Sequence, residues 1–372
     1  MKKKSVCIIR SNPVNPDSRV EKEAWTLLDL GYDVHVLAWD RSKNSSIENT
    51  VLRIMGKEIP IVRLCYKASF GEGMKNIVPY LKFQFAMRRW LQRNHYDVIH
   101  ACDFDTAFFS QGVVKKKSKY IFDIFDFIYG EPKSFFQRCV KNAQLKIINK
   151  ADAIILCTEE REQQIKGSYP QKLVFIHNTP MAEMIKAGDF IVNENNKIKV
   201  VYVGILQDFR LLKEIANCIA QNDRFEFHIG GFGKYESFFV DMSKKHNNII
   251  FHGKLSYDQT LSLERQCDIM LAVYDPSIEN HRFAAPNKFY ESLMLGKPVI
   301  MVRGTGMSDV VEEQDLGVLI DYSEKSFSEG LTKLLDRKNE WQIMGEKAKL
   351  IYKEKYNWDE MCNRLKELYE NL

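Results

Sequence analysis

Short apolar segments alternate with longer amphipathic segments along almost the whole chain. The first apolar segment, Ser5–Arg10, is a continuous run of the kind found in parallel strands buried on both faces. The next segment, Asp17–Leu30, places its apolar residues on one side of a helix, which Gly31 ends. The alternation continues to Leu173–His177 and begins again at Ile198–Val203. Two successive arrays of this kind predict two doubly wound α/β domains facing a cleft.

The chain of 372 residues is long enough for two such domains. Residues 180–197 lack strong periodicity and contain Gly188 and three asparagines, which is typical of a linker. We therefore expect a first domain over residues 1–187 and a second over residues 188–355. From about Ser326 to Asn371 the pattern is helical, with a break near Tyr356–Trp358.

The composition excludes several classes of protein. Hydrophobic residues make up 45% of the chain, yet we find no apolar run long enough to span a bilayer. The apolar run near the N-terminus ends at Arg10 and is too short for a secretion signal. The eight cysteines include no Cys-x-x-Cys pair, which indicates reduced thiols and disfavours a zinc site. We expect a cytoplasmic protein.

The formal charge is uneven along the chain. Residues 1–150 contain 26 Lys and Arg against 15 Asp and Glu, a net charge of +11, so the remainder carries −6 of the chain's +5. A basic first half predicts an anionic partner, and the candidates are nucleic acid and the anionic inner leaflet of a membrane. The helix expected over Lys75–Arg93 mixes aromatic and basic residues. It fits an interfacial helix or a core helix with a basic outer face.

The segment Ala285–Ile300 has the pattern of an extended entry, a helix, a glycine stop and a buried strand. The helix begins at Pro286 and Asn287 and places Lys288 in its first turn. The free N–H groups and partial positive charge of a helix N-terminus attract phosphate, and Lys288 adds a full charge. Glu291 shares the helix face of Lys288, where it could accept hydrogen bonds from a ribose diol. The segment suggests a nucleotide site, and a surface ion pair is the alternative.

Two glycine-containing turns follow the first two strands of the second array. Gly204 ends one strand, and Arg210 stands at the start of the next expected helix, where its planar fork could hold a second phosphate. An exposed helix arginine is the alternative. Gly231 lies in Gly230–Gly233, which lacks the third glycine of a dinucleotide fingerprint because residue 236 is glutamate. We interpret this segment as a tight turn against a ligand and expect no redox cofactor.

Carboxylates end two strands of the first array. Asp103 and Asp105 follow one strand and could hold a divalent metal, although we favour an N-cap and a first-turn acid for the next helix. Asp123 and Asp126 end the following strand. An acid there could contact a substrate hydroxyl or cap the helix that follows.

Four segments have the order and composition of motifs known from one protein family. They are Asn15–Val20 with Gly31–Val34, Asp97–Asp103, Tyr202–Arg210 and Pro286–Ile300. In these segments, and over essentially the whole chain, the sequence resembles the retaining glycosyltransferases of family 4, or glycosyl transferases group 1, of the bacterial surface-polysaccharide type. The most specific match is the last segment, in which Lys288 and Glu291 keep the family's spacing. The helix at Trp358 is similar to the family's terminal helix.

The resemblance implies the GT-B fold, in which two Rossmann-like domains face a cleft and a C-terminal helix, residues 356–372 here, packs back on the first domain. It implies transfer of a hexose or hexose derivative from a nucleotide sugar to a saccharide or lipid-linked acceptor, with retention of configuration. It implies no divalent metal and no other cofactor. Of the two anionic partners, the inner leaflet is favoured and nucleic acid is not expected. The protein would be cytoplasmic, with peripheral contact to the inner membrane left open.

Carried over residue by residue, the resemblance assigns two sets of site residues. The donor site would contain Gly204, Arg210, Gly231, Pro286, Asn287, Lys288 and Glu291. Arg210 and Lys288 would also act in catalysis by neutralising the diphosphate leaving group, and Glu291 would bind the ribose hydroxyls. The first-domain set would be Asp103 and Asp126 in catalysis, with Arg19 and His100 on the acceptor side.

Three positions depart from the family pattern. Phe283 stands where the first of two glutamates would fall, Cys102 replaces the second histidine of the strand-end motif, and Phe125 replaces the histidine near the sugar. These departures leave the catalytic assignments open. They keep two alternatives in view, a non-catalytic nucleotide-sugar-binding protein and a nucleotide-sugar epimerase of similar fold.

Overall fold

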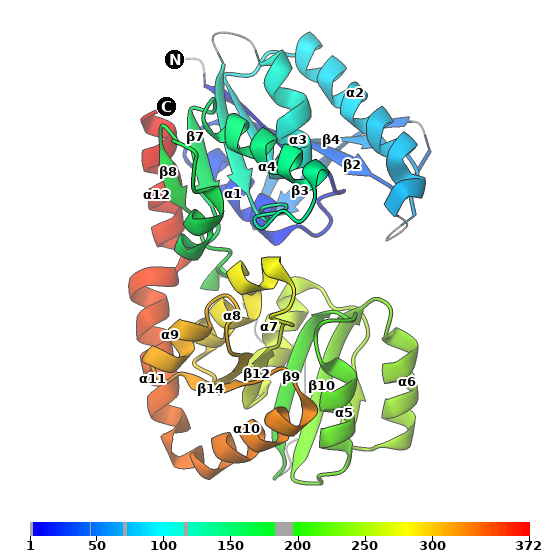
Figure 1. Ribbon diagram of the computed structural model, residues 1–372, viewed down its shortest axis with the longest axis vertical. Helices are drawn as coiled ribbons and strands as arrows, with labels where there is room; N and C mark the ends of the chain where they lie inside the picture. Colours follow the sequence, from blue (N-terminus) through cyan, green and yellow to red (C-terminus); the bar gives the residue numbers. More distant parts are fainter. Residues whose placement is uncertain (1–2, 45, 70–72, 115–117, 183–195) are drawn as a thin grey trace. The chain divides into compact units, whose positions relative to one another are not determined.

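The computed structural model of the protein describes residues 3–44, 46–69, 73–114, 118–182 and 196–372 (Figure 1). The chain divides into two compact units. The first comprises Met1–His177 together with Met361–Leu372, and the second comprises Asn178–Glu360. Each has its own mainly parallel sheet with helices, so the predicted α/β class with two Rossmann-like bodies is confirmed. The boundary expected between residues 187 and 188 lies outside the described residues.

The sheet of the first unit has the strand order β3-β4-β2-β1-β5-β6-β7-β8. Its strands are β1 (Ser5–Arg10), β2 (Asp33–Asp40), β3 (Ser46–Ile54), β4 (Lys57–Cys65), β5 (Val98–Cys102), β6 (Lys119–Ile124), β7 (Ala153–Leu156) and β8 (Leu173–Phe175). The hairpin of β3 and β4 turns at Met55 and Gly56, both with positive φ, and is antiparallel. The other neighbouring strands pair in parallel, so their carboxyl ends share the edge where ligands bind in such sheets.

Alternate residues of each strand face opposite sides of this sheet, and helices cover both sides (Figure 1). One side is covered by α2 (Ile77–Arg93), α3 (Asp103–Ser110) and α4 (Phe135–Ile148). The other side carries α1 (Ser18–Asp29) and α12 (Trp358–Glu370). On the first side, Trp39 of β2 stacks on Phe83 of α2 with ring centroids 5.3 Å apart. The core of this unit therefore lies in two layers, one on each face of the sheet.

Helix α12 completes the first unit although it comes last in the sequence. Met361 and Tyr369 are buried in this unit. The hydroxyl of Tyr369 lies 2.8 Å from Nδ1 of His100 in β5. Arg364 donates from Nη1 to the carbonyl oxygen of Phe175 in β8 at 3.0 Å. The helix thus covers part of the sheet face that α1 leaves open.

The sheet of the second unit has the order β11-β10-β9-β12-β13-β14 and is parallel throughout. Its strands are β9 (Ile198–Ile205), β10 (Phe225–Phe232), β11 (Ile249–Phe251), β12 (Ile269–Ala272), β13 (Val299–Val302) and β14 (Gly317–Ile320). One face packs on α5 (Leu212–Ala220), α6 (Glu236–Lys245) and α10 (Glu324–Asp336). The other packs on α7 (Tyr257–Gln266), α8 (Asn287–Leu295), α9 (Ser308–Glu313) and α11 (Trp341–Ile351). The order in which successive strands are added to the sheet reverses between β9 and β12, as in doubly wound sheets.

Two predicted helices differ from the observed ones. The helix expected from Phe209 begins only at Leu212, because Phe209 and Leu211 have positive φ values of 65° and 54° that no helix accepts. Arg210 therefore lies in a loop and not on a helix. The C-terminal helix expected from Ser326 is interrupted after Asp336, before α11 begins.

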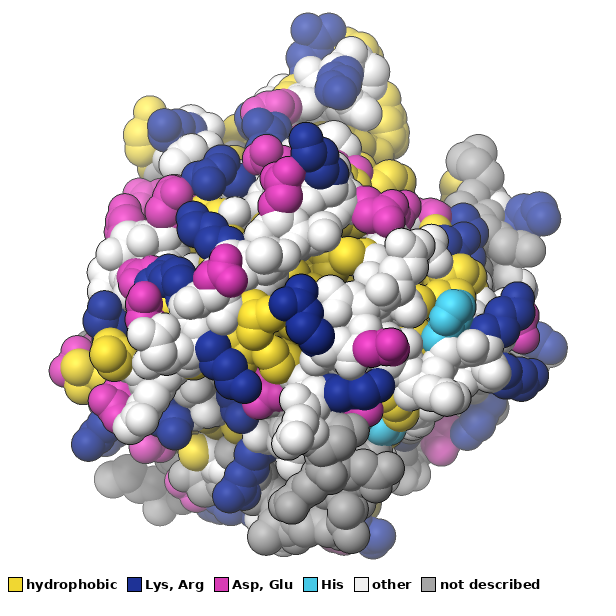
Figure 2. All heavy atoms as spheres, turned by 90° about the horizontal axis from the view of Figure 1, so that it is seen from below, with side chains coloured by type: hydrophobic (Ala, Val, Ile, Leu, Met, Phe, Trp, Pro, Cys, Tyr) yellow, Lys and Arg dark blue, Asp and Glu magenta, His cyan; other side chains and the backbone are white. Residues whose placement is uncertain are grey.

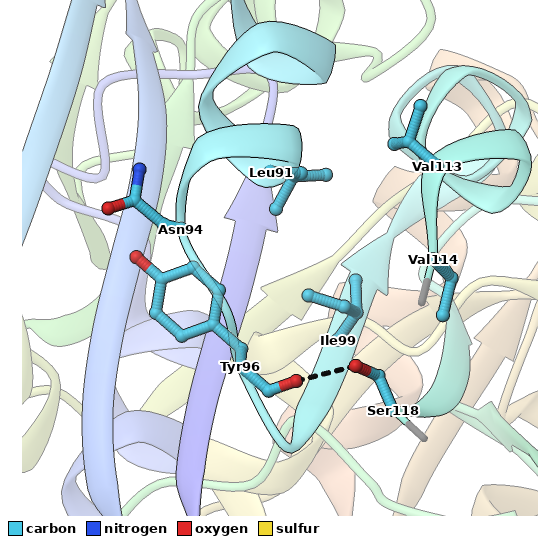
Figure 3. Close-up of a pocket in the computed structure, with 7 residues that line it drawn as sticks. All are labelled: Leu91, Asn94, Tyr96, Ile99, Val113, Val114 and Ser118. Carbon is cyan, nitrogen blue, oxygen red and sulfur yellow. Dashed lines mark hydrogen bonds between the residues drawn. The ribbon is translucent and has the colours of Figure 1, made fainter. Parts of the chain in front are cut away.

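A cavity of about 10 Å³ lies in the first unit and is lined by seven residues, among which Ser118 donates from Oγ to the carbonyl of Tyr96 at 2.7 Å (Figure 3). It has room for about one water molecule. Figure 2 shows one face of the molecule, on which basic and acidic side chains are interspersed with small apolar patches. Among the described helices, none has the length and apolar character needed to cross a membrane.

Candidate functional site

Gly204 and Gly231 lie opposite each other near the carboxyl ends of β9 and β10. Gly231 has a φ of +133°, and a Cβ placed on it would lie 1.8 Å from the carbonyl oxygen of Gly204. No side chain fits at residue 231, so the two backbones approach closely because that residue is glycine. We expected the turn at Gly231 to lie against a ligand, but its close contact is with the neighbouring strand β9.

Lys288 extends from the first turn of α8 toward Gly204. Its Nζ would lie 2.9 Å from a Cβ on Gly204, and it stands over the ring of Tyr202 at 4.6 Å from the centroid. Pro286 occupies the N-cap position of α8, where it makes no side-chain capping bond. The partial positive charge of the helix N-terminus therefore adds to that of the buried ammonium group.

Two other polar residues predicted in this helix are engaged within the second unit. Oδ1 of Asn287 accepts a hydrogen bond from Nδ2 of Asn178 at 2.7 Å. Glu291 is only 2% exposed, and its carboxylate bonds to the side chain of Tyr257. A ribose that bound to Glu291 would compete with Tyr257 for this carboxylate.

Arg210 is held by contacts on several sides. Its Nη1 donates to the carbonyl of Phe209 and to Nε2 of His281, each at 3.0 Å. Because a guanidinium has no acceptor, Nε2 of His281 is the accepting nitrogen, and Nδ1 carries the proton donated to the carbonyl of Asp275 at 2.9 Å. The guanidinium also lies over the ring of Tyr274, 4.0 Å from the centroid. Both N–H groups of Nη1 are thereby used.

Tyr202 brings the two cations together. Lys288 lies over its ring, and Arg210 bonds to its side chain. The tyrosine is fixed in turn, because its hydroxyl donates to the carbonyl of Ile205 at 3.1 Å. Two full positive charges therefore stand beside the turn after Gly204. Together with the N-terminus of α8, they make a site suited to a diphosphate.

A buried carboxyl group lies behind these cations. Glu264 of α7 is fully buried, and neither of its oxygens has a hydrogen-bond partner among the described residues. Burial raises the pKa of Glu264 well above its usual range, Glu291 adds to this shift, and Lys288 opposes it. Burial lowers the pKa of Lys288, but the charges of Tyr202, Tyr274 and the carboxylates outweigh it and the net shift is upward. The upward shift keeps the ammonium group of Lys288 charged at neutral pH.

In the first unit, Asp103 connects two strand ends. Its Oδ1 accepts the backbone N–H groups of Phe125 at 3.0 Å and Asp126 at 3.1 Å, and its Oδ2 pairs with Arg10. Burial raises the pKa of Asp103 to about 6, although Arg10 works against the shift. The prediction that Asp103 caps α3 is wrong. The N-cap is Cys102, and the carboxylate of Asp103 is used across the sheet.

Asp126 lies next to Asp103 on the loop after β6. Its side chain is 64% exposed, and its Oδ1 accepts from Nη2 of Arg161 at 3.0 Å. The fold therefore brings the two carboxylates predicted to be catalytic onto one edge of the first sheet. Their part in catalysis stays a prediction.

Arg19 and His100, predicted on the acceptor side, lie in a buried polar network. Nη2 of Arg19 pairs with Oδ1 of Asp123 at 2.8 Å, and Nε2 of His100 lies 3.2 Å from Oδ2 of the same carboxylate. Tyr369 covers the other nitrogen of the imidazole. Burial raises the pKa of Asp123, but Arg19 and His100 outweigh it and hold that pKa below its usual range. A contact with an acceptor would require this network to open, and the assignment stays a prediction.

Two groups of described side chains have the spacing of a metal site. They are His100 with Cys102 and Asp123, and Asp40 with Glu48 and Cys65. In the first group, burial raises the pKa of the Cys102 thiol well above its usual range, which disfavours the thiolate that a metal requires. In the second group, Glu48 is paired with Lys43 at 2.5 Å. Neither group presents a set of uncommitted ligands.

Several residues of the site were not predicted from the sequence. Tyr202, Tyr274, His281 and Glu264 all contact or influence the two cations. Tyr274 follows the strand predicted at Asp268–Val273, so its strand-end position was a usable signal. Tyr202 begins the segment Tyr202–Arg210 that the sequence pattern already indicates. His281 and Glu264 carry no such signal, because they are placed by packing between distant segments.

The chain matches two protein families over different ranges. Residues 19–179 match the family described as Glycosyltransferase Family 4, and residues 197–337 match the one described as Glycosyl transferases group 1. A curated relative, an uncharacterized glycosyltransferase of Methanocaldococcus jannaschii, is 23% identical over 185 residues. That alignment spans 48% of this chain and 46% of the relative, so the chain is matched to about half of the relative's length.

Solved structures resemble the whole chain. Sucrose-phosphate synthase from Thermosynechococcus elongatus has a TM-score of 0.76 at 13% identity and covers 99% of both chains. The Anabaena protein HepE in complex with UDP-glucose has a TM-score of 0.69 at 13% identity, covering 99% of this chain and 100% of the other. Starch synthase IV of Arabidopsis thaliana, bound to ADP and acarbose, has a TM-score of 0.67 at 14% identity, covering 100% and 99%. At these identities the likeness concerns the fold alone.

Proposed function

Because the chain belongs to the family 4 glycosyltransferases of group 1, we propose that it transfers a hexose or hexose derivative from a nucleotide sugar to a saccharide or lipid-linked acceptor. We further propose that the transfer retains the configuration at the anomeric carbon and needs no bound metal. The second unit would bind the donor, and the first unit would bind the acceptor.

The observation that carries this proposal is the convergence of Arg210 and Lys288 on Tyr202 beside Gly204. A nucleotide sugar leaves its diphosphate group behind when the sugar is transferred, so negative charge grows on that group in the transition state. Two fixed cations and a helix N-terminus would stabilise this charge without rearrangement. They would also make a divalent metal unnecessary for the same purpose. The solved relatives that contain UDP-glucose or ADP support a nucleotide-containing donor.

In the proposed reaction, the bond between the anomeric carbon and the diphosphate oxygen breaks and the electron pair leaves with the diphosphate. The acceptor hydroxyl attacks the same face of the sugar, and a phosphate oxygen takes its proton. Arg210 would meet the diphosphate through N–H groups other than those of Nη1, which are occupied by Phe209 and His281. His281 thus fixes which edge of the guanidinium meets the donor.

Arg210→Ala and Glu291→Gln should each weaken nucleotide binding by about 1–3 kcal/mol, because each removes a hydrogen bond to a charged group. A thermal-shift screen against UDP-, GDP-, ADP-, CDP- and dTDP-sugars identifies the nucleotide, since a ligand bound to the folded state raises the apparent stability. Calorimetric titration then gives the two affinities. Arg224→Ala is the control, because Arg224 is exposed at the start of β10 and bonds to Asn222. If both site variants bind the nucleotide with native affinity, the assignment of Arg210 and Glu291 to the donor site is wrong.

A location at the inner membrane surface is proposed from charge. The first 150 residues carry a net charge of +11, and α2 contains exposed Ile77, Val78 and Phe85 together with basic residues. Basic segments are attracted to anionic lipids, and exposed apolar side chains can enter the headgroup region. This placement would suit a lipid-linked acceptor and a cytoplasmic protein without a spanning helix.

Binding to vesicles should depend on lipid charge and on salt. We expect the protein to sediment with vesicles containing phosphatidylglycerol at low ionic strength and to be released as the salt concentration rises toward 1 M, where the Debye length falls to about 3 Å. Vesicles of phosphatidylcholine alone are the control and should retain little protein. Equal binding to both kinds of vesicle, or binding that salt does not change, would contradict the electrostatic attachment.

The two alternative functions give different products from the same assay. A nucleotide-sugar epimerase would convert the donor to an isomer without any acceptor. A non-catalytic binding protein, which Phe283 and Phe125 keep in view, would bind the donor without turnover across a broad panel of acceptors. Formation of a glycosidic product with release of the nucleoside diphosphate separates the proposed function from both.

A further inference from the structure

A cavity of about 640 Å³ lies at the carboxyl edge of the first sheet, and none of the residues assigned to the donor site or to catalysis lines it. Its walls come from the loop after β1, the end of β2, the start of β3 and the end of β4. Arg41, Lys43 and Arg63 are the cations in these walls. Because this is the edge where ligands bind in parallel sheets, the cavity is placed to hold a substrate group.

Arg41 is held in place by an aromatic ring and a backbone carbonyl. Its guanidinium lies over the ring of Trp39 at 4.1 Å from the centroid, and its Nη2 donates to the carbonyl of Ser11 at 3.2 Å. Its Nε is buried and has no hydrogen-bond partner in the described residues. Burial lowers the pKa of Arg41, and the charge of Asp105 only partly offsets this. An anion bound beside Arg41 would relieve this desolvation.

Arg63 is held in a similar way. Its Nε donates to the carbonyl of Pro13 at 2.8 Å, in the same loop that fixes Arg41. The two acids of the cavity have partners within its own wall, and the charge of Asp40 also interacts with that of Arg63. Asp40 accepts from the backbone N–H and the hydroxyl of Ser42 at 2.8 and 2.7 Å, and Glu48 pairs with Lys43. Within the described part of the chain, neither guanidinium has a carboxylate oxygen within 4.0 Å.

We propose that this cavity binds a phosphate group of the acceptor, so that the acceptor is a sugar phosphate or a diphosphate-linked saccharide. Two guanidinium groups anchored by backbone carbonyls present fixed forks of N–H donors, which match the oxygens of a phosphate. The assignment rests on the proposed function, since it names the acceptor class for that reaction.

The cavity is connected to the carboxylates predicted to be catalytic. Asn12, in the cavity wall, donates from Nδ2 to Oδ2 of Asp17 at 2.7 Å. The same oxygen accepts from Nε of Arg10 at 2.9 Å, and Arg10 pairs with Asp103. A chain of hydrogen bonds thus joins the phosphate cavity to Asp103. An acceptor anchored by its phosphate would have its sugar held along the edge that carries Asp103.

The test compares two ligands across a set of variants. Glucose 1-phosphate is the probe of the cavity, and the nucleoside diphosphate identified by the screen is the probe of the donor site. Arg41→Gln and Arg63→Gln should each weaken binding of glucose 1-phosphate by about tenfold to a hundredfold, the loss expected for a charged hydrogen bond. Arg41→Lys keeps the positive charge but removes the planar set of guanidinium N–H donors, so it should lower the affinity for glucose 1-phosphate by a smaller factor. Arg53→Gln is the matched control, because Arg53 is 78% exposed on β3 and pairs with Glu58.

The outcomes separate this inference from the proposed function. Arg210→Ala should lower the affinity for the nucleoside diphosphate and leave the affinity for glucose 1-phosphate unchanged. The cavity variants should lower the affinity for glucose 1-phosphate and leave that for the nucleoside diphosphate unchanged. Unchanged binding of glucose 1-phosphate in both cavity variants would overturn the inference alone. Equal affinity for methyl glucoside, or for inorganic phosphate, would overturn the acceptor class. No binding of any nucleoside diphosphate by the unmodified protein would overturn the proposed function, whatever the cavity binds.

Discussion

Replacing Lys288 with methionine should reduce the rate of sugar transfer by about a hundredfold to a thousandfold, the loss seen when one preorganised donor is removed from a developing negative charge. Methionine has a similar length and fills the space beside Gly204 and Tyr202, so the change removes charge more than volume. The diphosphate leaving group would then face Arg210 and the helix N-terminus alone. The measurement is kcat with saturating donor and acceptor.

The loss of stability and the loss of activity in Lys288→Met should have different causes, which a second substitution can distinguish. Glu264 and Glu291 lose the cation beside them, so Lys288→Met should also lower the free energy of unfolding. Adding Glu264→Gln removes one uncompensated carboxyl group and should recover part of this stability without restoring kcat. Lys297→Met, at the other end of α8, should leave kcat unchanged. If the double variant recovered kcat, the role of Lys288 at the leaving group would be wrong.

Replacing Gly231 with alanine should lower the free energy of unfolding by about 2–5 kcal/mol. One part is overpacking, typically about 1–3 kcal/mol, because the new Cβ would lie 1.8 Å from the backbone oxygen of Gly204. Another part is the cost of an L-residue at positive φ, about 1–2 kcal/mol. The strands β9 and β10 must shift apart, so the turn beside Lys288 moves and nucleotide affinity should fall as well. Thermal unfolding and calorimetric titration measure the two effects.

Gly304→Ala separates the two parts of that loss. Gly304 has a φ of +71°, and a Cβ there would meet no atom within 4 Å. Its replacement should therefore cost only the conformational part, about 1–2 kcal/mol. Equal losses of stability in the two variants would show that the close approach of Gly231 to Gly204 contributes nothing.

The strands were predictable because burial on both faces leaves a clear pattern. Ser5–Arg10, Lys119–Ile124 and Gly317–Ile320 have the bounds expected from the sequence, since each is an apolar run that ends where polar or turn residues begin. The loop of Phe209 and Leu211 was not predictable. Its positive φ values occur in residues that are not glycine and depend on contacts such as the bond from the N–H of Leu211 to the hydroxyl of Tyr322.

The candidate site was predictable where it follows strand and helix ends. Lys288 and Arg210 could be placed together because both follow from the order of elements and from residue type. The roles of His281 and Glu264 could not, because each depends on how its segment packs against a distant one. Asp103 shows the same limit, since a residue that begins a helix by sequence pattern uses its carboxylate to bind a neighbouring loop.

The return of α12 to the first unit has a consequence for how the protein is made. Met361–Leu372 are synthesised only after the whole second unit. Until then the emerging first unit lacks the helix that buries His100 and its polar network. The second unit, in topological terms an insertion within the first, can finish folding before the unit that precedes it. A single cut in the connection after His177 would therefore not release a complete first unit.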